Sequence, residues 1–123
     1  MLNLNSIMLS SEKPKELAEF YSKVLDKKPD MEENNFIGFM AESCFLSIGG
    51  HDKVKGKNPA PEWIMMFFET KDVNGEFERI KGLGAKVIAE PYHPGTDNND
   101  FWLATLADPD GNYFQLASPW NQE

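Results

Sequence analysis

The two histidines, His51 and His93, carry the side chains best suited to proton transfer near neutral pH. His51 lies in the turn-rich segment GGHDKVKGKNPAP at 49–61, and His93 lies in PYHPGTDNND at 91–100. One of them could act as a general base or cover a bound molecule, and His93 is the better candidate because long loops often cover sites. We favour the simpler interpretation of both as solvent-exposed loop residues, since a single residue is a weak signal.

Three acidic residues stand at positions where a carboxylate could have a role. Glu69 ends an apolar run, WIMMFFET at 63–70, and strand alternation places it on the same face as Met65 and Phe67. It is a candidate buried carboxylate for proton transfer or for pairing with a cationic ligand, although it could equally point to solvent. Asp108 and Asp110 belong to a DPDG sequence, where we expect them to shape a turn.

Aromatic residues are frequent in the segments that we predict to be strands. Flat side chains suit a flat or apolar ligand, but strand alternation sends about half of them into the core. Cys44 is the only cysteine, so it forms no internal disulfide, and we interpret it as a small core residue. The aromatic residues concerned are Phe36, Phe39, Phe45, Trp63, Phe67, Phe101 and Trp102.

The composition is that of one globular domain of 123 residues. A net charge of −8 disfavours binding to nucleic acid or to anionic membranes and mildly favours cationic ligands. The longest apolar run, 63–68, is too short for a membrane helix, and the N-terminus lacks a signal-peptide pattern. Together with the single cysteine, these features favour the cytoplasm.

The first half begins with a predicted strand at 2–10, in which Met8 faces away from its neighbours. A helix follows, with Ser11 as a possible N-cap and Pro14 in its first turn, and Pro29 stops it. Its apolar stripe comprises Leu17, Phe20, Tyr21, Val24 and Leu25.

Two short apolar runs, 35–40 and 44–48, have the spacing of an antiparallel hairpin. The segment 49–61 that follows has no periodicity and should be an exposed connector. We therefore divide the single domain into a first module at about 1–50, a linker at about 51–61 and a second module at about 62–123.

The second half repeats this order. The run 63–70 predicts a strand covered on both faces, and Asp72 and Gly84 are typical of the start and end of a helix. The apolar residues of that helix are Val73, Phe77, Ile80 and Leu83, and further strands are predicted at 86–90, 101–107 and 112–117.

The two halves align at an offset of 56 to 57 residues, which indicates an internal duplication. Each half reads as a strand, a helix, and then two or three strands. Two arrangements use this order: a ferredoxin-like sandwich with one sheet, or two modules with curved sheets around a cleft. The extra strand in each half favours the second, but the pattern alone leaves the choice open.

Three segments resemble the superfamily of glyoxalases, bleomycin-resistance proteins and extradiol dioxygenases, also called vicinal oxygen chelate proteins. The run KPKELAEFYSKVLDKKP at 13–29 is similar to its first helix, although Lys13 and Asp26 replace the usual aspartate and glycine. The runs KDVNGEFERIKGLGAKVIAEP at 71–91 and ADPDGNYFQLASP at 107–119 resemble its second helix and last hairpin, and DPDGN is the most specific motif.

The resemblance implies an α+β fold of two tandem βαβββ modules whose curved mixed sheets surround a cleft, often within a homodimer. It also implies the four positions at which metal-dependent relatives carry ligands. These positions fall on Ser6 and near Ser47 in the first half, and on Met65 and Gln115 in the second. Serine and methionine do not displace water favourably from a divalent metal, so we predict no metal and no cofactor.

We predict instead that the cleft binds a small molecule, with Phe67, Glu69 and Trp102 joining these four residues in a ligand-binding set. The favoured function is a metal-free binder that sequesters an aromatic or cationic compound, as the antibiotic-resistance branch does. One alternative is a lyase, isomerase or dioxygenase, and another is a non-catalytic dimeric regulatory module. Fold resemblance separates these three functions poorly.

Overall fold

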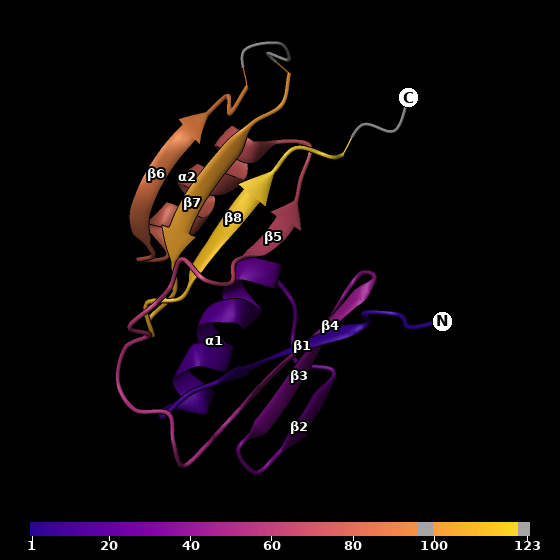
Figure 1. Cartoon of the computed structure of the whole chain (residues 1–123), viewed down its shortest axis with the longest axis vertical. Coiled ribbons are helices and arrows are strands. Elements are labelled where there is room, and N and C mark those ends of the chain that lie inside the picture. Colours follow the sequence, from indigo (N-terminus) through magenta and orange to yellow (C-terminus); the bar gives the residue numbers. More distant parts are fainter. Residues whose placement is uncertain (96–99, 121–123) are drawn as a thin grey trace. The chain divides into compact units, whose positions relative to one another are not determined.

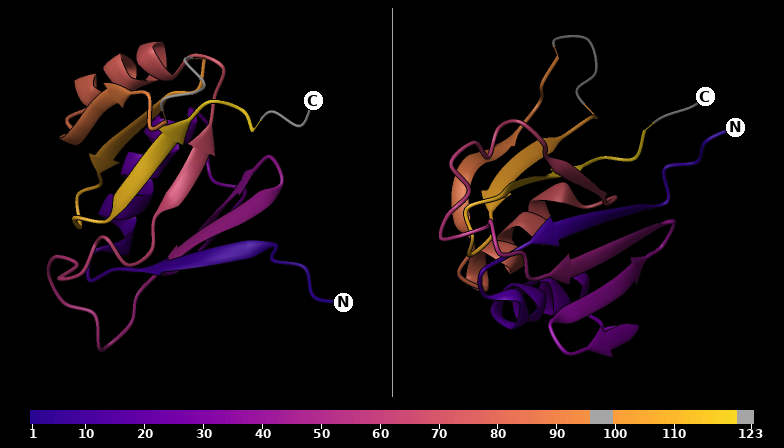
Figure 2. Two further views of the ribbon diagram at one scale, coloured as in Figure 1. Left: turned by 45° about the horizontal axis from the view of Figure 1, so that its top comes forward. Right: turned by 60° about the horizontal axis from the view of Figure 1, so that its bottom comes forward.

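The computed structural model describes residues 1–95 and 100–120 of the chain. The chain divides into two compact units, Met1–Lys57 (unit 1) and Asn58–Glu123 (unit 2), and the division falls within the connector expected at 49–61. Among the described residues, each unit has one helix and its own four-stranded mixed sheet (Figures 1 and 2). The prediction of two βαβββ modules is confirmed, and a single ferredoxin-like sheet is excluded.

Unit 1 contains five elements: β1 (Ser6–Ser10), α1 (Pro14–Leu25), β2 (Met31–Glu33), β3 (Phe36–Ala41) and β4 (Cys44–Gly49). The strand order is β1-β4-β3-β2, and β1 is parallel to β4 whereas the other neighbours are antiparallel. Because α1 packs on β3 and β4, it covers one face of this sheet.

Helix α1 forms where apolar residues recur every three or four positions, and this stripe buries Leu17, Tyr21 and Val24. The helix ends at Asp26, which adopts a left-handed conformation with φ 55° and donates its N–H to the Ser22 carbonyl oxygen. The prediction of Ser11 as N-cap is wrong, because Lys13 takes that position. The Ser11 hydroxyl oxygen instead accepts the Lys13 N–H at 2.9 Å, in a turn before the helix.

Unit 2 contains β5 (Met66–Glu69), α2 (Val73–Gly82), β6 (Lys86–Tyr92), β7 (Leu103–Ala107) and β8 (Tyr113–Ala117). Its strand order, β5-β8-β7-β6, repeats that of unit 1, again with one parallel pair, β5 and β8. Helix α2 packs on β6, β7 and β8.

The ends of α2 match the prediction from sequence. Asp72 caps the start, since its Oδ1 accepts the Gly75 N–H at 2.9 Å, and a Cβ at Gly75 would collide with that carboxylate. After the helix, Gly84 has φ 99°, a conformation that favours glycine.

In the described chain no helix is long and apolar enough to cross a membrane.

The core of each unit lies between its helix and its sheet. Burial of each large apolar side chain contributes about 1.5–3 kcal/mol, so these layers supply most of the stability of each unit. The fully or nearly fully buried residues include Leu17, Tyr21, Ile37, Phe39, Leu46 and Ile48 in unit 1, and Phe77, Ile80, Leu106, Phe114 and Leu116 in unit 2. We call the face of each sheet that its helix does not cover the open face.

Three strands differ from the sequence-based predictions. β1 starts at Ser6 rather than at residue 2, and β2 was not predicted because its three residues, Met-Glu-Glu, are all exposed and show no apolar alternation. The expectation that 63–70 is covered on both faces is wrong. β5 is shorter than that run, and Trp63 and Ile64 before it are 86% and 77% exposed.

The loop predicted at 91–100 is partly strand, because β6 continues to Tyr92 through irregular pairing with β7. Residues 96–99 of that loop lie outside the described residues. β7 begins at Leu103, so Phe101 and Trp102 precede the strand in which they were expected.

Candidate functional site

The open face of unit 1 carries three rows of side chains that cross its strands. Residues alternate between the two faces of a strand, so the register of paired strands defines each row. The first row is Glu33, Phe36, Gly49 and Ser10; the second is Met31, Gly38, Ser47 and Met8; the third is Met40, Phe45 and Ser6.

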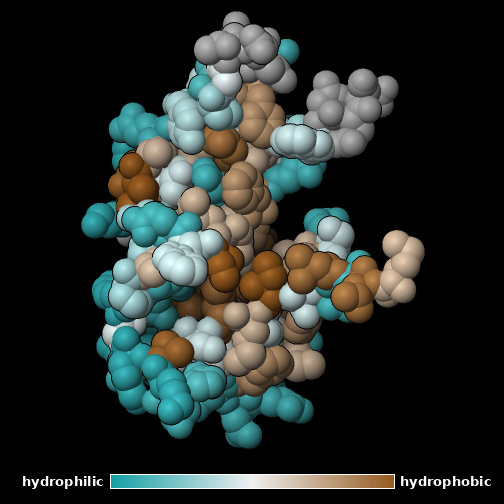
Figure 3. Space-filling model, viewed as in Figure 1, coloured by the Kyte–Doolittle hydropathy of each residue, from teal (hydrophilic) through white to brown (hydrophobic). Residues whose placement is uncertain are grey.

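The middle of this face is made of small residues. A Cβ at Gly38 would collide with the ring of Phe45, so that ring lies across the glycine. Ser47 is buried, and its hydroxyl lies 3.5 Å from the Ile7 carbonyl oxygen, at the limit of a hydrogen bond. The centre of the face is therefore built on small residues and covered by the Phe45 ring, and Figure 3 shows hydrophobic residues gathered over the β1 side of this unit.

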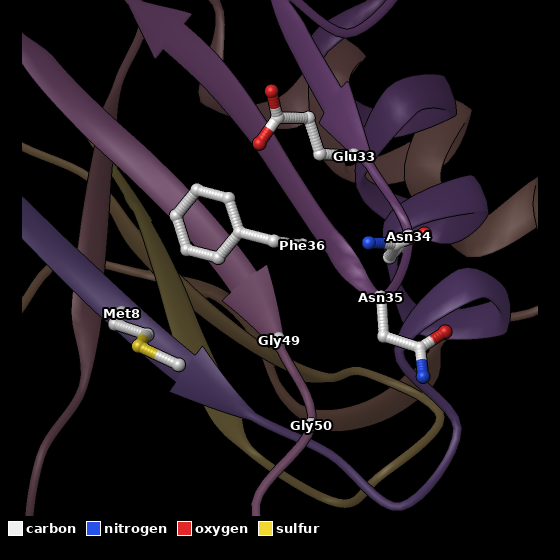
Figure 4. Close-up of a pocket in the computed structure, with 7 residues that line it drawn as sticks. All are labelled: Met8, Glu33, Asn34, Asn35, Phe36, Gly49 and Gly50. Carbon is white, nitrogen blue, oxygen red and sulfur yellow. The ribbon is translucent and has the colours of Figure 1, made fainter.

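An open depression of about 450 Å³ lies at the first row (Figure 4). Gly49 keeps its floor open, because a Cβ there would lie 3.0 Å from Met8 Cε and 3.4 Å from Phe36 Cδ1. Any side chain at position 49 would therefore fill the gap between these two apolar groups. The lining residues are Met8, Glu33, Asn34, Asn35, Phe36, Gly49 and Gly50.

The rim of the depression is polar. Glu33, Asn34 and Asn35 are exposed, and their side chains make no hydrogen bond or ion pair with any residue that the structure describes. Figure 4 shows the side chains of Glu33, Phe36 and Met8 on the same side of the sheet. The depression thus combines an apolar floor with unpartnered carboxylate and carboxamide groups.

The open face of unit 2 has a different centre. Thr105 and Gln115 face each other across β7 and β8, both buried, and the Thr105 hydroxyl donates to Gln115 Oε1 at 2.9 Å. The carboxamide nitrogen of Gln115 contacts Met65 Sδ at 3.9 Å. Beside this pair Phe67 is 59% exposed, so an aromatic ring and a buried polar pair form the middle of the face.

The structure brings most of the predicted ligand-binding residues onto these two open faces. Ser6 and Ser47 lie on neighbouring strands in unit 1, and Met65, Phe67, Glu69 and Gln115 lie on one side of the β5–β8 pair in unit 2. Glu69 is exposed, so of the two alternatives left open for its carboxylate the structure shows the solvent-facing one.

Four residues that line the depression, Glu33, Asn34, Asn35 and Gly49, belong to no motif in the sequence that predicts a site. Their only signal was a short polar turn before an apolar run. Their proximity follows from strand register rather than from spacing.

Trp102 lies away from the Thr105–Gln115 pair, just before the start of β7, where its backbone N–H donates to Ser118 Oγ at 2.9 Å. Its ring centroid is 3.9 Å from that of His93, and His93 Nδ1 lies 2.9 Å from the Phe101 carbonyl oxygen. Because a carbonyl only accepts, Nδ1 carries a proton in this contact. His93 is half-buried and anchored at both its ring and its nitrogen, so the expectation of a fully solvent-exposed side chain is wrong for it.

His51 is exposed, as expected, and its Nδ1 accepts the Lys53 N–H at 3.0 Å.

The expected structural role of Asp108 is confirmed. Its Oδ1 accepts the N–H groups of Asp110 and Asn112 at 2.9 and 3.0 Å, which closes the DPDG turn. Asn112 Oδ1 in turn accepts from Asn58 Nδ2 at 2.8 Å, which ties the start of unit 2 to that turn.

The four positions corresponding to metal ligands do not fit a divalent metal. Ser6 and Ser47 offer only hydroxyl groups, Met65 offers a thioether, and the Gln115 oxygen already accepts from Thr105. The described residues also contain no group of three or more His, Cys, Asp or Glu side chains placed to hold a metal ion.

Comparison with solved structures finds the same fold in several proteins. A glyoxalase-related enzyme from Fulvimarina pelagi superposes with a TM-score of 0.78 at 16% identity, covering 97% of this chain and 89% of that chain. A glyoxalase/bleomycin resistance protein/dioxygenase family enzyme from Burkholderia phytofirmans PsJN gives 0.75 at 18% identity, covering 95% and 98%. The fosfomycin resistance protein FosX from Listeria monocytogenes gives 0.70 at 14% identity, covering 98% and 93%.

These identities are low enough that they support the fold alone. The search of curated proteins found no significant match. The model of the glyoxalase-like domain matches residues 6–117, which span both units. The chain therefore belongs to the glyoxalase-like domain family, within the superfamily of glyoxalases, bleomycin-resistance proteins and dioxygenases.

Proposed function

We propose that the protein binds a small organic molecule without converting it, and that the depression on the open face of unit 1 takes part in binding. The depression itself carries the proposal: its volume of about 450 Å³ is within the range of roughly 300–1,000 Å³ that is usual for ligand pockets. Its mixture of apolar walls and a few polar groups is also typical of such sites.

The expected ligand is aromatic or cationic. Phe36 and Met8 offer flat and polarisable surfaces, and the net charge of −8 attracts cations at long range. Sequestration of a toxic compound is the favoured role. Proteins of the same fold include a member of a glyoxalase/bleomycin resistance protein/dioxygenase family and a fosfomycin resistance protein, and these names are the reason for proposing a role in resistance.

Binding without a metal is part of this proposal, and the donor set supports it. We expect purified protein to contain no stoichiometric metal, and we expect Mg²⁺, Mn²⁺, Ni²⁺ and Zn²⁺ to leave the melting temperature unchanged. A tightly bound metal at a hundred times its dissociation constant would instead add about 2.7 kcal/mol to the free energy of unfolding. Elemental analysis and thermal-shift titration measure both quantities.

The test of the site is a pair of glycine variants. Gly49→Ala places a methyl group against Met8 and Phe36, so it should weaken binding of any aromatic fragment that stabilises the wild type by about threefold or more. Gly82→Ala adds the same group on α2, where nothing lies within 4 Å, and should leave binding unchanged. Equal affinities for the two variants would refute the placement of the ligand in unit 1.

Stoichiometric metal with metal-dependent turnover would replace this proposal by the enzyme alternative, a lyase, isomerase or dioxygenase. Failure of every fragment to bind would favour the non-catalytic regulatory module. We further propose a cytoplasmic homodimer, and light scattering coupled to gel filtration tests its mass against the 14.0 kDa of one chain.

A further inference from the structure

We propose that the depression in unit 1 selects an aromatic ammonium ion, whose charged group pairs with Glu33 and whose ring packs against Phe36 and Met8. This inference deepens the proposed function and rests on it, because it names the ligand class and the residues that recognise it.

The Glu33 carboxylate lies beside the apolar part of the depression. Glu33 pairs directly with Phe36 across β2 and β3, on the open face, and Phe36 pairs with Gly49 on β4. Directly opposed residues in an antiparallel pair have Cβ atoms about 4.5–5.5 Å apart. A ring that rests on Phe36 above Gly49 therefore has the Glu33 carboxylate within reach of a short aminoalkyl chain.

The Glu33 carboxylate is free to pair with a ligand cation. Asp30, three residues earlier, is engaged: its Oδ2 accepts the Met40 N–H at 2.7 Å and lies 2.8 Å from Lys27 Nζ. Glu33 has no such partner among the described residues, and Lys27 Nζ also donates to the Met40 carbonyl oxygen at 2.9 Å. A ligand cation at Glu33 thus displaces no ion pair that the structure shows.

The apolar part of the depression suits an aromatic ring attached to that cation. Met8 is 51% exposed, so its thioether is accessible to a ligand, and thioether–aromatic contacts are favourable. Phe36 is half-buried beside it. A cation close to the Phe36 ring gains a further attraction to the face of that ring.

The polar rim favours an ammonium group that carries N–H donors. Asn34 provides an unpartnered carboxamide oxygen next to Glu33 in the chain. The backbone carbonyl oxygen of Asn35 would lie 3.5 Å from a Cβ at Gly49, which places it at the floor, whereas the Asn35 side chain points away from Glu33 (Figure 4). A primary ammonium has three N–H donors for these acceptors, whereas a quaternary ammonium has none.

The experiment compares three probes of similar shape: 2-phenylethylammonium, the neutral 2-phenylethanol and the anionic 3-phenylpropanoate. Binding is followed by the methyl resonance of Met8 in protein labelled at its methionine methyl groups, with Met8→Leu to assign that resonance. We expect 2-phenylethylammonium to bind about fivefold more tightly than 2-phenylethanol at low ionic strength, and 3-phenylpropanoate to bind most weakly.

Two variants test the role of the carboxylate. Glu33→Gln keeps the shape of the side chain and should reduce the preference for the ammonium to about one. Glu32→Gln removes the same charge from the neighbouring exposed residue, whose side chain alternation sends to the other face, and should keep the preference. Because both positions are exposed, both variants should fold.

The outcomes separate the two proposals. Equal affinity for the alcohol and the ammonium, or an unchanged preference in Glu33→Gln, would overturn the ammonium assignment and leave small-molecule binding in place. If none of the three probes moves the Met8 resonance at millimolar concentration, small-molecule binding in this depression is itself overturned.

Discussion

The two units share one framework but differ on their open faces. On the helix side, α1 and α2 bury corresponding residues, with Tyr21 of unit 1 matching Phe77 of unit 2. On the open face, Gly38 and Ser47 pair at the centre of unit 1, whereas Thr105 and Gln115 pair at the centre of unit 2. The Phe45 ring covers the small residues of one centre, and a hydrogen-bonded polar pair fills the other.

This difference shows which part of a duplicated module can diverge. The helix side must pack at the density of a protein interior, so only residues of similar size and polarity are compatible with it. The open face has no helix to pack against, and glycine, serine, threonine and glutamine can all occupy it. Specificity can therefore change on the open face at little cost to the fold.

Substitutions on the helix side, where the two units bury corresponding residues, should cause the largest loss in the free energy of unfolding. Phe77→Ala and Tyr21→Ala each empty a position that is 2% exposed or less, so each should lower the free energy of unfolding by about 3–5 kcal/mol. Urea denaturation measures the loss, and Glu78→Ala on the exposed side of α2 is the control. A loss below about 1 kcal/mol in only one of the two variants would contradict the shared framework.

A smaller effect is expected from the polar pair of unit 2. Thr105→Val removes the hydroxyl that donates to Gln115 Oε1 and leaves a buried carboxamide oxygen without its donor. The expected loss in the free energy of unfolding is about 1–3 kcal/mol. Thr105→Ser keeps the hydroxyl and should recover most of that loss; a valine variant as stable as the serine variant would show that the hydrogen bond contributes nothing.

The centre of the open face of unit 1, where the Phe45 ring covers Gly38, should be less sensitive to substitution. Gly38→Ala brings a methyl group into the ring of Phe45, but that ring is half-buried and can rotate away, so we expect a loss of about 1 kcal/mol. The ring resonances of Phe45 should shift in the NMR spectrum. Unchanged resonances would show that the Phe45 ring does not lie over Gly38.

The smallest change in stability is expected at Asp30, in the connection between α1 and β2. In unit 1, hydrogen bonds from the Lys27 ammonium and the Met40 N–H hold the pKa of Asp30 below its ordinary value of 3.8. In the described part of unit 2, no ion pair spans the matching connection, where Gly84 makes the turn.

A carboxyl group with a lowered pKa stabilises the folded state above its unfolded pKa and loses this contribution as pH falls through the folded pKa. Asp30→Asn should therefore be slightly less stable than the wild type at neutral pH, and the difference should vanish in strong acid. Thermal melts across this pH range, with Glu32→Gln as a control, measure it. A difference that persists in strong acid would rule out the titration of Asp30 as its cause.

The sequence predicted the features that depend on local patterns. Asp72 and Gly84 mark the ends of α2 because a cap and a left-handed turn require particular residues. Ser11 failed as a cap because a serine hydroxyl can serve a turn before the helix equally well. The prediction of a strand covered on both faces at 63–70 failed because an apolar run does not show where a strand begins, and Trp63 and Ile64 precede β5.

The candidate site in unit 1 depends on contacts between residues that are distant in sequence. Gly49 forms the floor only because it pairs with Phe36, and Glu33 reaches the same row only through β2. β2 has no apolar alternation that would predict a strand, so its register, and with it the depression, was outside what sequence patterns could show.

All three tryptophans, Trp63, Trp102 and Trp120, belong to unit 2, and the described fluorophores of unit 1 include only one tyrosine, Tyr21. Tryptophan fluorescence, excited at wavelengths that tyrosine does not absorb, therefore reports on unit 2 alone. Circular dichroism, in contrast, averages over the helices and strands of both halves. Melting curves recorded by the two methods will coincide if the halves unfold together and separate if they unfold in succession, so the native protein carries its own probe of cooperativity between its repeats.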